Sequence, residues 1–163
     1  MNLGDLRLTR GEEDPKQRAP AISLFLAFVA LVPVLAGTGV VLLSDEEETA
    51  AAIERPTIGW AAAVLCFLAG VRRGLSFRQP GGSKLRDLAD MFGLFVLGVG
   101  GVILPGPRAA ATSLVLGYGV LGLRDPQAAR RGEAPRYFAR LRPIQVLLPM
   151  GALLGLMLRR RKG

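Results

Sequence analysis

The first apolar block of the chain, residues 21–43, limits the possible folds more than any other feature. Its 23 residues contain no charged side chain, and as a helix rising about 1.5 Å per residue they would span roughly 34 Å. That length is enough to cross the roughly 30 Å of hydrocarbon in a bilayer. Pro33, near the middle, predicts a kink whose freed backbone carbonyl is covered by a neighbour such as Thr38 or by another helix.

Four further apolar blocks follow, separated by charged or Pro/Gly-rich segments. Together the blocks predict an all-α fold, an integral membrane bundle of about five transmembrane helices over residues 20–158. A polar cytoplasmic tail (1–19) precedes it and a basic C-terminal tail (159–163) follows it. The expected spans are residues 21–43, 57–77, 87–105, 109–123 and 143–158.

The fourth and fifth blocks leave the exact topology open. About fifteen residues in 109–123 are fewer than the roughly 17 that a perpendicular span needs. The fourth block would cross where the bilayer thins, or the third and fourth blocks would form a re-entrant hairpin. The last block carries Pro149, so both a full and a partial crossing remain open for it.

Two of the connecting segments contain signals for short surface helices. Ser44 and Glu47 have the spacing of a capping box, and Pro56 would end the helix that they begin. In the long charged loop, Asp125 and Pro126 form an N-cap and N1 pair, which predicts a second short helix.

Small residues recur at four-residue spacing in several blocks, the pattern that lets another membrane helix approach closely. Gly117 also begins a G-x-G-x-x-G match, but no strand precedes it, so we interpret it as a packing glycine rather than a nucleotide site. The residues expected at helix contacts are Ala62, Cys66, Gly70, Gly74, Ser113, Gly117, Gly151 and Gly155.

The composition argues against an enzyme. The chain has no histidine and one cysteine, so it lacks the commonest general base and metal ligand and forms no internal disulfide. We find no nucleophile and base pair, no metal-ligand set and no cofactor motif. The net charge of +8 comes from cations that flank apolar blocks, which favours anionic membrane lipids over nucleic acid as partners.

The distribution of lysine and arginine predicts the orientation of the five spans. With the N-terminus in the cytoplasm, fifteen cations lie in cytoplasmic segments and six lie on the other side. The positive-inside rule therefore predicts a cytoplasmic N-terminus and a C-terminus on the opposite side of a bacterial inner membrane.

Charged residues near the cytoplasmic ends of the spans form the candidate site. Asp87 and Asp90 lie one helical turn apart, and we expect them to form ion pairs with Arg72 and Arg73 of the preceding antiparallel helix. These charges either fix the order of the helices or form a basic pocket for a cardiolipin-like headgroup or a partner subunit. The full candidate cluster is Arg72, Arg73, Asp87, Asp90, Arg124, Asp125, Tyr137, Arg140 and Arg142.

Two motifs carry a family resemblance over roughly residues 20–158. Residues 67–75, Phe-Leu-Ala-Gly-Val-Arg-Arg-Gly-Leu, and the loop pattern from Asp125 through Ala128 to Arg142 resemble the signatures of small uncharacterised membrane proteins similar to transmembrane protein 69. Ala69 stands where that family has glycine, and Arg73 stands where it has tryptophan. The resemblance implies bioenergetic membranes, those of proteobacteria and the mitochondrial inner membrane.

These observations lead to a function hypothesis and two alternatives. The first is a non-enzymatic accessory or assembly subunit that packs against a larger inner-membrane complex, respiratory or otherwise bioenergetic. It follows from the small-residue stripes, which exceed what a five-helix bundle needs internally. The alternatives are a small transporter or channel, suggested by Pro33, Pro149 and the short fourth block, and an anionic-lipid-binding protein.

Overall fold

The computed structural model describes residues 21–77, 84–132 and 137–159, without the side chains of Ser23 and Phe138. This part of the chain is all-α, and it contains six helices and no strand. The predicted tail 1–19, the polar turn at 78–83 and the basic residues 160–163 lie outside the described residues. The helices are α1 (Ala21–Val29), α2 (Val32–Leu43), α3 (Glu47–Ser76), α4 (Leu85–Ile103), α5 (Pro107–Arg130) and α6 (Phe138–Leu158).

Helices α1 and α2 are the two halves of one bent helix, and the bend lies just before Pro33. Because proline has no backbone N–H, the hydrogen-bond ladder cannot continue through this position. The Nε1–H of Trp60 in α3 donates a hydrogen bond of 2.8 Å to the carbonyl of Ala30, in the bend. A residue of another helix therefore satisfies a carbonyl in the bend, one residue after Val29, whose helical donor would have been the N–H that Pro33 lacks. The buried Thr38 hydroxyl makes no hydrogen bond in the described structure.

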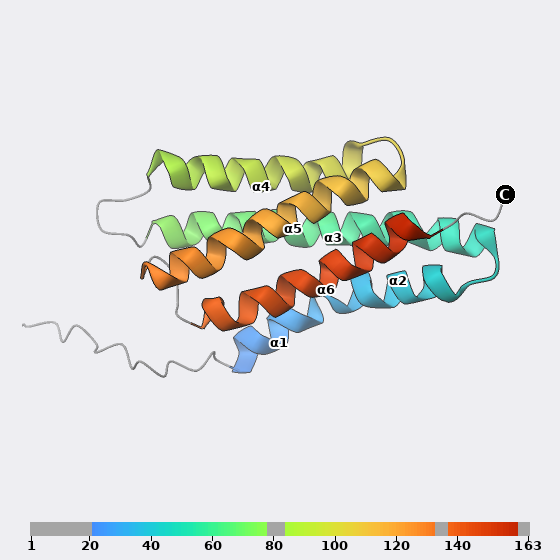
Figure 1. The fold of residues 1–163 in the computed structure, drawn as a ribbon, viewed down its shortest axis with the longest axis horizontal. Helices are drawn as coiled ribbons and strands as arrows, with labels where there is room; N and C mark the ends of the chain where they lie inside the picture. Colours follow the sequence, from blue (N-terminus) through green and yellow to red (C-terminus); the bar gives the residue numbers. More distant parts are fainter. Residues whose placement is uncertain (1–20, 78–83, 133–136, 160–163) are drawn as a thin grey trace, which may run out of the picture.

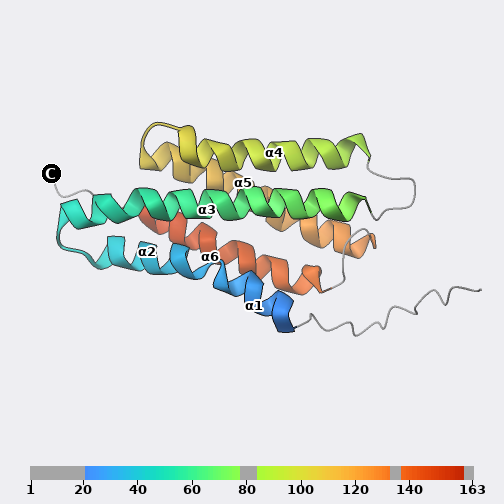
Figure 2. The same ribbon diagram turned by 180° about the vertical axis from the view of Figure 1, so that it is seen from behind.

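The helices run side by side along one axis, and consecutive long helices are antiparallel (Figure 1). Helix α3 is central, because it contacts α2, α4, α5 and α6, and α5 packs most extensively on α6. Seen from behind, α3 lies between α4 and the bent α1–α2 helix (Figure 2). The start of α1 and the end of α6 lie at opposite ends of the bundle (Figure 1), as a bundle of five antiparallel units requires.

The outer surface of the bundle is apolar on every helix. Large exposed side chains include Phe25 of α1, Phe67 of α3, Phe92 of α4, Leu116 of α5 and Leu147 of α6. A soluble protein would expose these side chains at a high cost in hydration free energy, whereas lipid tails solvate them. Three described segments are long and apolar enough to span a membrane: Leu24–Leu43, Glu47–Ser76 and Ala139–Leu158. The fold is that of an integral membrane bundle.

The core between the helices combines alanines with a few large side chains. Leu65, Leu114 and Leu121 are fully buried, together with several alanines of α3 and α5. Tyr118 is also buried, and its hydroxyl donates a hydrogen bond of 2.8 Å to the carbonyl of Ala61. Small residues permit close approach of the backbones, and the tyrosine hydroxyl is satisfied, as a polar group in an apolar core must be.

The prediction of a separate short helix ending at Pro56 is wrong, because α3 runs without interruption from Glu47 to Ser76. Its N-cap is Glu46, and the predicted Ser44–Glu47 capping box does not form. Pro56 costs the helix one backbone hydrogen bond. Residues on both sides of it are buried in the bundle, among them Ala50 and Ile58, and this packing keeps one continuous helix.

The helix that contains the predicted fourth span is also longer than that span. Helix α5 has 24 residues, or roughly 36 Å, and contains Pro126 in its interior, so no separate short helix begins at Asp125. Leu121, Asp125 and Ala128 continue one buried face through its last turns. Helices α4 and α5 lie along the length of the bundle as an antiparallel pair (Figure 1).

Candidate functional site

An ion-pair network joins four helices at the end of the bundle where α3 and α5 finish and α4 and α6 begin. Arg72 of α3 lies between two carboxylates. One of its terminal nitrogens is 3.2 Å from an oxygen of Asp90 in α4, and the other contacts Asp125 in α5. A single guanidinium therefore links three helices.

Two further arginines complete the network. The Nε of Arg142 in α6 lies 2.8 Å from the second oxygen of Asp125, although its N–H is not aligned as a hydrogen bond. Arg124 of α5 approaches the second oxygen of Asp90 to 3.7 Å. The ion-pair network therefore comprises Arg72, Asp90, Arg124, Asp125 and Arg142, with positive and negative groups alternating.

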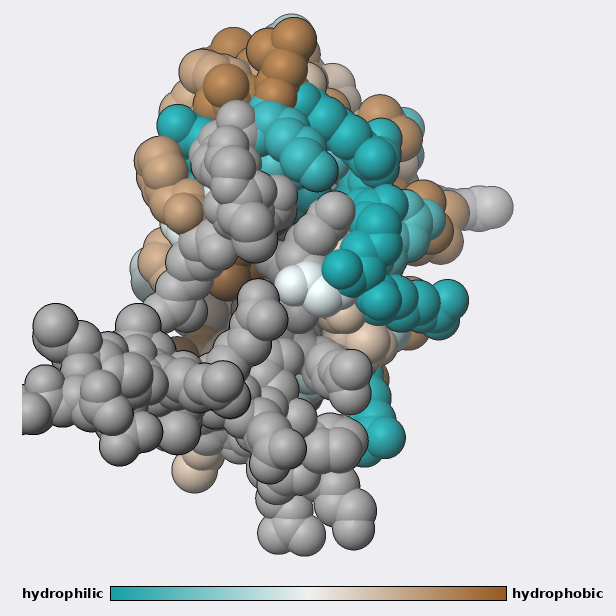
Figure 3. Space-filling view, turned by 90° about the vertical axis from the view of Figure 1, so that its left-hand side faces the viewer, coloured by the Kyte–Doolittle hydropathy of each residue, from teal (hydrophilic) through white to brown (hydrophobic). Residues whose placement is uncertain are grey.

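The network is buried most deeply at the Asp125–Arg142 pair. The side chain of Asp125 is 4% exposed and that of Arg142 is 5% exposed, whereas Arg124 is 38% exposed. Three arginines and two aspartates leave one excess positive charge. An end-on view shows hydrophilic residues gathered on this end of the bundle, beside apolar residues at its rim (Figure 3).

The position of the network along the helices matches a membrane boundary. Residues 56–71 of α3 and 143–158 of α6 contain no charge, and sixteen helical residues span roughly 24 Å. Arg72 directly follows the first of these segments, and Arg142 directly precedes the second. Charges at this depth are costly unless paired, and the network pairs them.

Three further candidates, Arg73, Asp87 and Arg140, form no ion pair with the network within the described part of the chain. Arg73 packs its guanidinium over the ring of Phe77, 4.2 Å from the centroid. Asp87 accepts a hydrogen bond of 3.1 Å from the N–H of Lys84 and so caps α4, rather than sharing the arginine that Asp90 binds. Arg140 is exposed, and Tyr137 is half-buried directly before α6.

The predicted packing residues divide into two groups. A methyl group at Gly117 would overlap Leu65, and Gly155 faces Leu42. Ser113 donates a hydrogen bond of 2.8 Å to the carbonyl of Leu97. Ala62 and Cys66 pack against Gly98. By contrast, a methyl group at Gly70, Gly74 or Gly151 would meet no neighbouring atom within 4 Å.

The helical region of the chain matches one known protein family. A family model described as "Protein of unknown function (DUF3429)" matches residues 19–158. The chain belongs to this family. No curated protein and no solved structure matches it. The DUF3429 match covers all of the described helices, including every member of the ion-pair network.

Two contacts that stabilise this DUF3429 bundle were not predicted from the sequence. Arg159 binds Glu47 through two hydrogen bonds of 3.1 and 2.8 Å, which join the end of α6 to the start of α3. Trp60 is the only tryptophan in the chain, and that rarity in an apolar block was the one available hint of its role at the bend.

Proposed function

We propose that this protein is a non-enzymatic accessory or assembly subunit that packs against a larger complex in the inner membrane. The observation that carries the proposal is an open face of α3. Trp60, Phe67 and Phe77 are exposed on this face, and Gly70 and Gly74 lie between the two phenylalanines. At 100° per residue these positions fall within one stripe of the helix.

The two glycines have no packing role inside the described bundle. A methyl group at either position would meet nothing within 4 Å, yet glycine costs a helix up to about 1 kcal/mol relative to alanine. Small residues four apart on a membrane helix let a second helix approach closely. A partner helix seated on Gly70 and Gly74, between Phe67 and Phe77, would make use of them.

The resemblance to transmembrane protein 69 adds a location to this proposal. It favours a bioenergetic membrane, and for a bacterial chain that is the inner membrane, with the N-terminus in the cytoplasm. The partner would then be a respiratory or other energy-converting complex. Neither the ion-pair network nor the open face of α3 has the arrangement of a nucleophile and a base.

The transporter alternative receives less support from the geometry. It requires charged residues that face a water-filled path inside the bundle. Asp90 instead contacts Arg72 and Arg124. The network ties the helices together at one end, which suits a fixed structural unit.

The test is a gentle purification of the full-length tagged protein from its own membrane in a bilayer-preserving polymer, followed by mass spectrometry. The proposal predicts stoichiometric recovery of a membrane complex. Recovery of the protein alone, or with lipid only, would contradict the proposal and favour an autonomous lipid-binding or transport role. Recovery of a second copy alone would contradict a larger complex and favour self-association.

Variants of the open face make the test specific. Gly70→Leu and Gly74→Leu place side chains on the α3 face, where space is free, so the monomer should fold while partner recovery falls at least tenfold. Gly93→Leu in α4 is the matched control, because its added side chain also meets open space. Equal recovery with all three variants would locate any partner on another face.

A further inference from the structure

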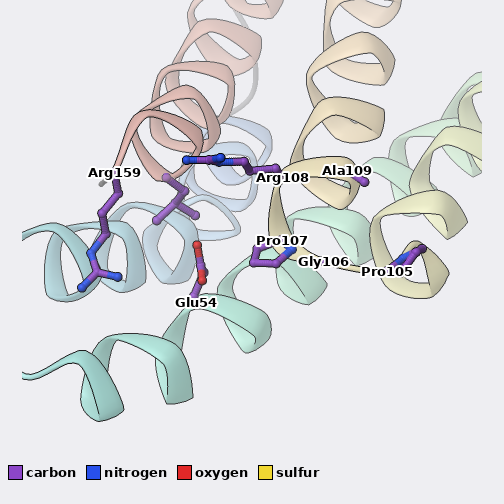
Figure 4. A pocket seen from close by; sticks show the side chains of 8 residues that line it. Glu54, Pro105, Gly106, Pro107, Arg108, Ala109 and Arg159 are labelled. Carbon is purple, nitrogen blue, oxygen red and sulfur yellow. The ribbon is translucent and has the colours of Figure 1, made fainter. Parts of the chain in front are cut away.

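A second polar region lies at the opposite end of the bundle, where the turn between α4 and α5 meets α3 and α6. It contains a cavity of about 720 Å³, within the usual range of 300–1,000 Å³ for small-molecule sites. Figure 4 shows Glu54, Arg108 and Arg159 around the same space. The lining residues are Glu54, Pro105, Gly106, Pro107, Arg108, Ala109, Leu156 and Arg159.

The two arginines of this cavity differ in their existing partners. Arg159 is held in place by Glu47, whose two carboxylate oxygens accept its hydrogen bonds. The guanidinium of Arg108 makes no ion pair within the described part of the chain. Arg108 is therefore the cation that remains available to a ligand.

The first turn of α5 adds backbone donors beside Arg108. The helix begins at Pro107, no side chain caps it, and its N-cap Gly106 has a φ of 81°. The first N–H with an acceptor in the helix is that of Ala110, which bonds to Gly106. The N–H groups of Arg108 and Ala109 thus have no acceptor within the helix, and the positive end of the helix dipole lies beside them.

The remaining walls determine the orientation of a ligand. Glu54 is buried and places a carboxylate on the α3 side of the cavity (Figure 4). Leu156, Pro105 and Pro107 supply apolar walls. An anionic group would lie against Arg108 and the start of α5, away from the negative charge of Glu54.

The position of the cavity indicates where the ligand comes from. Arg108 directly precedes the uncharged segment 109–123, and Arg159 directly follows the uncharged segment 143–158. The cavity therefore lies at the depth of lipid headgroups. Val102, Ile103 and Leu158, close by in the chain, are exposed and apolar. A phospholipid could keep its tails on this surface while its headgroup enters the cavity.

We propose that this cavity is a binding site for the phosphate-bearing headgroup of a phospholipid. Arg108 and the N–H groups at the start of α5 donate hydrogen bonds to the phosphate, Arg159 adds a second positive charge, and the negative charge of Glu54 keeps the phosphate on the α5 side of the cavity. The site is independent of the proposed partner surface on α3, since no residue is common to both.

The experiment uses the full-length protein, stripped of lipid in a neutral detergent. Short-chain phosphatidylglycerol, diacylglycerol with the same chains, and inorganic phosphate are titrated separately, and binding is measured by native mass spectrometry. The lipid with a phosphate should bind, and the lipid without it should bind at least tenfold more weakly. Arg108→Gln should weaken phosphatidylglycerol binding at least tenfold.

Arg55→Gln is the matched control, because Arg55 is an exposed cation near the same end that does not line the cavity. Circular dichroism and melting of each variant exclude unfolding as the cause. Equal weakening by the two substitutions, or none by Arg108→Gln, would overturn the assignment. Binding of inorganic phosphate without binding of the lipid would overturn the lipid source and leave a site for a soluble phosphate.

Discussion

The indole N–H of Trp60 in α3 and the carbonyl of Ala30 form a hydrogen bond of 2.8 Å across the bend between α1 and α2. In hydrocarbon no water is present to satisfy a carbonyl that leaves a helix ladder. The pair therefore joins two spans and satisfies a backbone group at the same point.

Replacement of Trp60 by phenylalanine tests this pair. Trp60→Phe keeps an aromatic side chain but removes the donor, and interhelical hydrogen bonds in membranes contribute about 0.6–2 kcal/mol. We expect a loss of stability of about 1 kcal/mol in detergent melting, together with faster hydrogen exchange near residue 30. Phe67→Leu, an exposed aromatic position, is the control, and equal effects of both would argue against a specific role for the pair.

The neighbours Arg72 and Arg73 should respond differently to substitution. Arg72→Ala leaves Asp90 and Asp125 without a shared cation, and removing one partner of a buried pair costs about 3–5 kcal/mol. Steady-state abundance in the membrane should therefore fall severalfold. Arg73→Ala loses a contact with Phe77 worth roughly 0.5–1 kcal/mol, so abundance should change little. Similar abundance of the two variants would argue against the network.

Two glycines of α4 provide a matched test of close packing. A methyl group at Gly101 would overlap Leu114, whereas one at Gly93 meets open space. Overpacking of this kind costs about 1–3 kcal/mol, so Gly101→Ala should lower the melting temperature. Gly93→Ala should leave it unchanged or raise it, since alanine favours the helix by up to about 1 kcal/mol. A reversed order would show that α4 packs on α5 in another register.

The pair of Glu47 and Arg159 should contribute to the attachment of α6 to α3. Glu47→Gln removes the charge that holds Arg159 through two hydrogen bonds. Because Glu47 is 38% exposed, we expect only about 0.5–1 kcal/mol of lost stability, and less at high salt. Glu48→Gln removes the same charge one residue later in the first turn of α3, so it should lose only the helix-dipole contribution that both variants share and should destabilise less than Glu47→Gln.

The two ends of the chain should lie on opposite sides of the membrane. Five antiparallel units place the start of α1 and the end of α6 at opposite ends of the bundle (Figure 1). Reporter fusions in a bacterial host should show a cytoplasmic N-terminus, from the distribution of lysine and arginine, and a C-terminus outside the cytoplasm. Detection of both termini on one side would mean that one unit does not cross.

Local sequence was sufficient for the fold class and for much of the candidate cluster. Long uncharged blocks such as 21–43 predict helices in a membrane, because hydrocarbon admits few other structures. The four-residue spacing of Gly117 and its neighbours indicated packing positions. The antiparallel order of the spans also predicts that Arg72, Asp90 and Asp125 lie at the same end of the bundle.

The extents of α3 and α5 depended on the tertiary structure. Pro56 and Pro126 have the local chemistry of helix boundaries, yet both lie inside helices. Burial of Ala50 and Ile58 in α3, and of Asp125 in α5, stabilises those turns by contacts with other helices. The residue pattern within one helix does not report the free energy of its contacts with other helices.

The sequence by itself determined that this chain is a helical membrane protein, because the length and apolarity of a block suffice to choose lipid as its solvent. Only the tertiary structure decided which charged side chains pair with one another. Arg72 bridges Asp90 and Asp125, while Asp87 caps its own helix. The choice depends on helix rotation and depth, which are set by side-chain packing across the whole bundle and not by spacing within one helix.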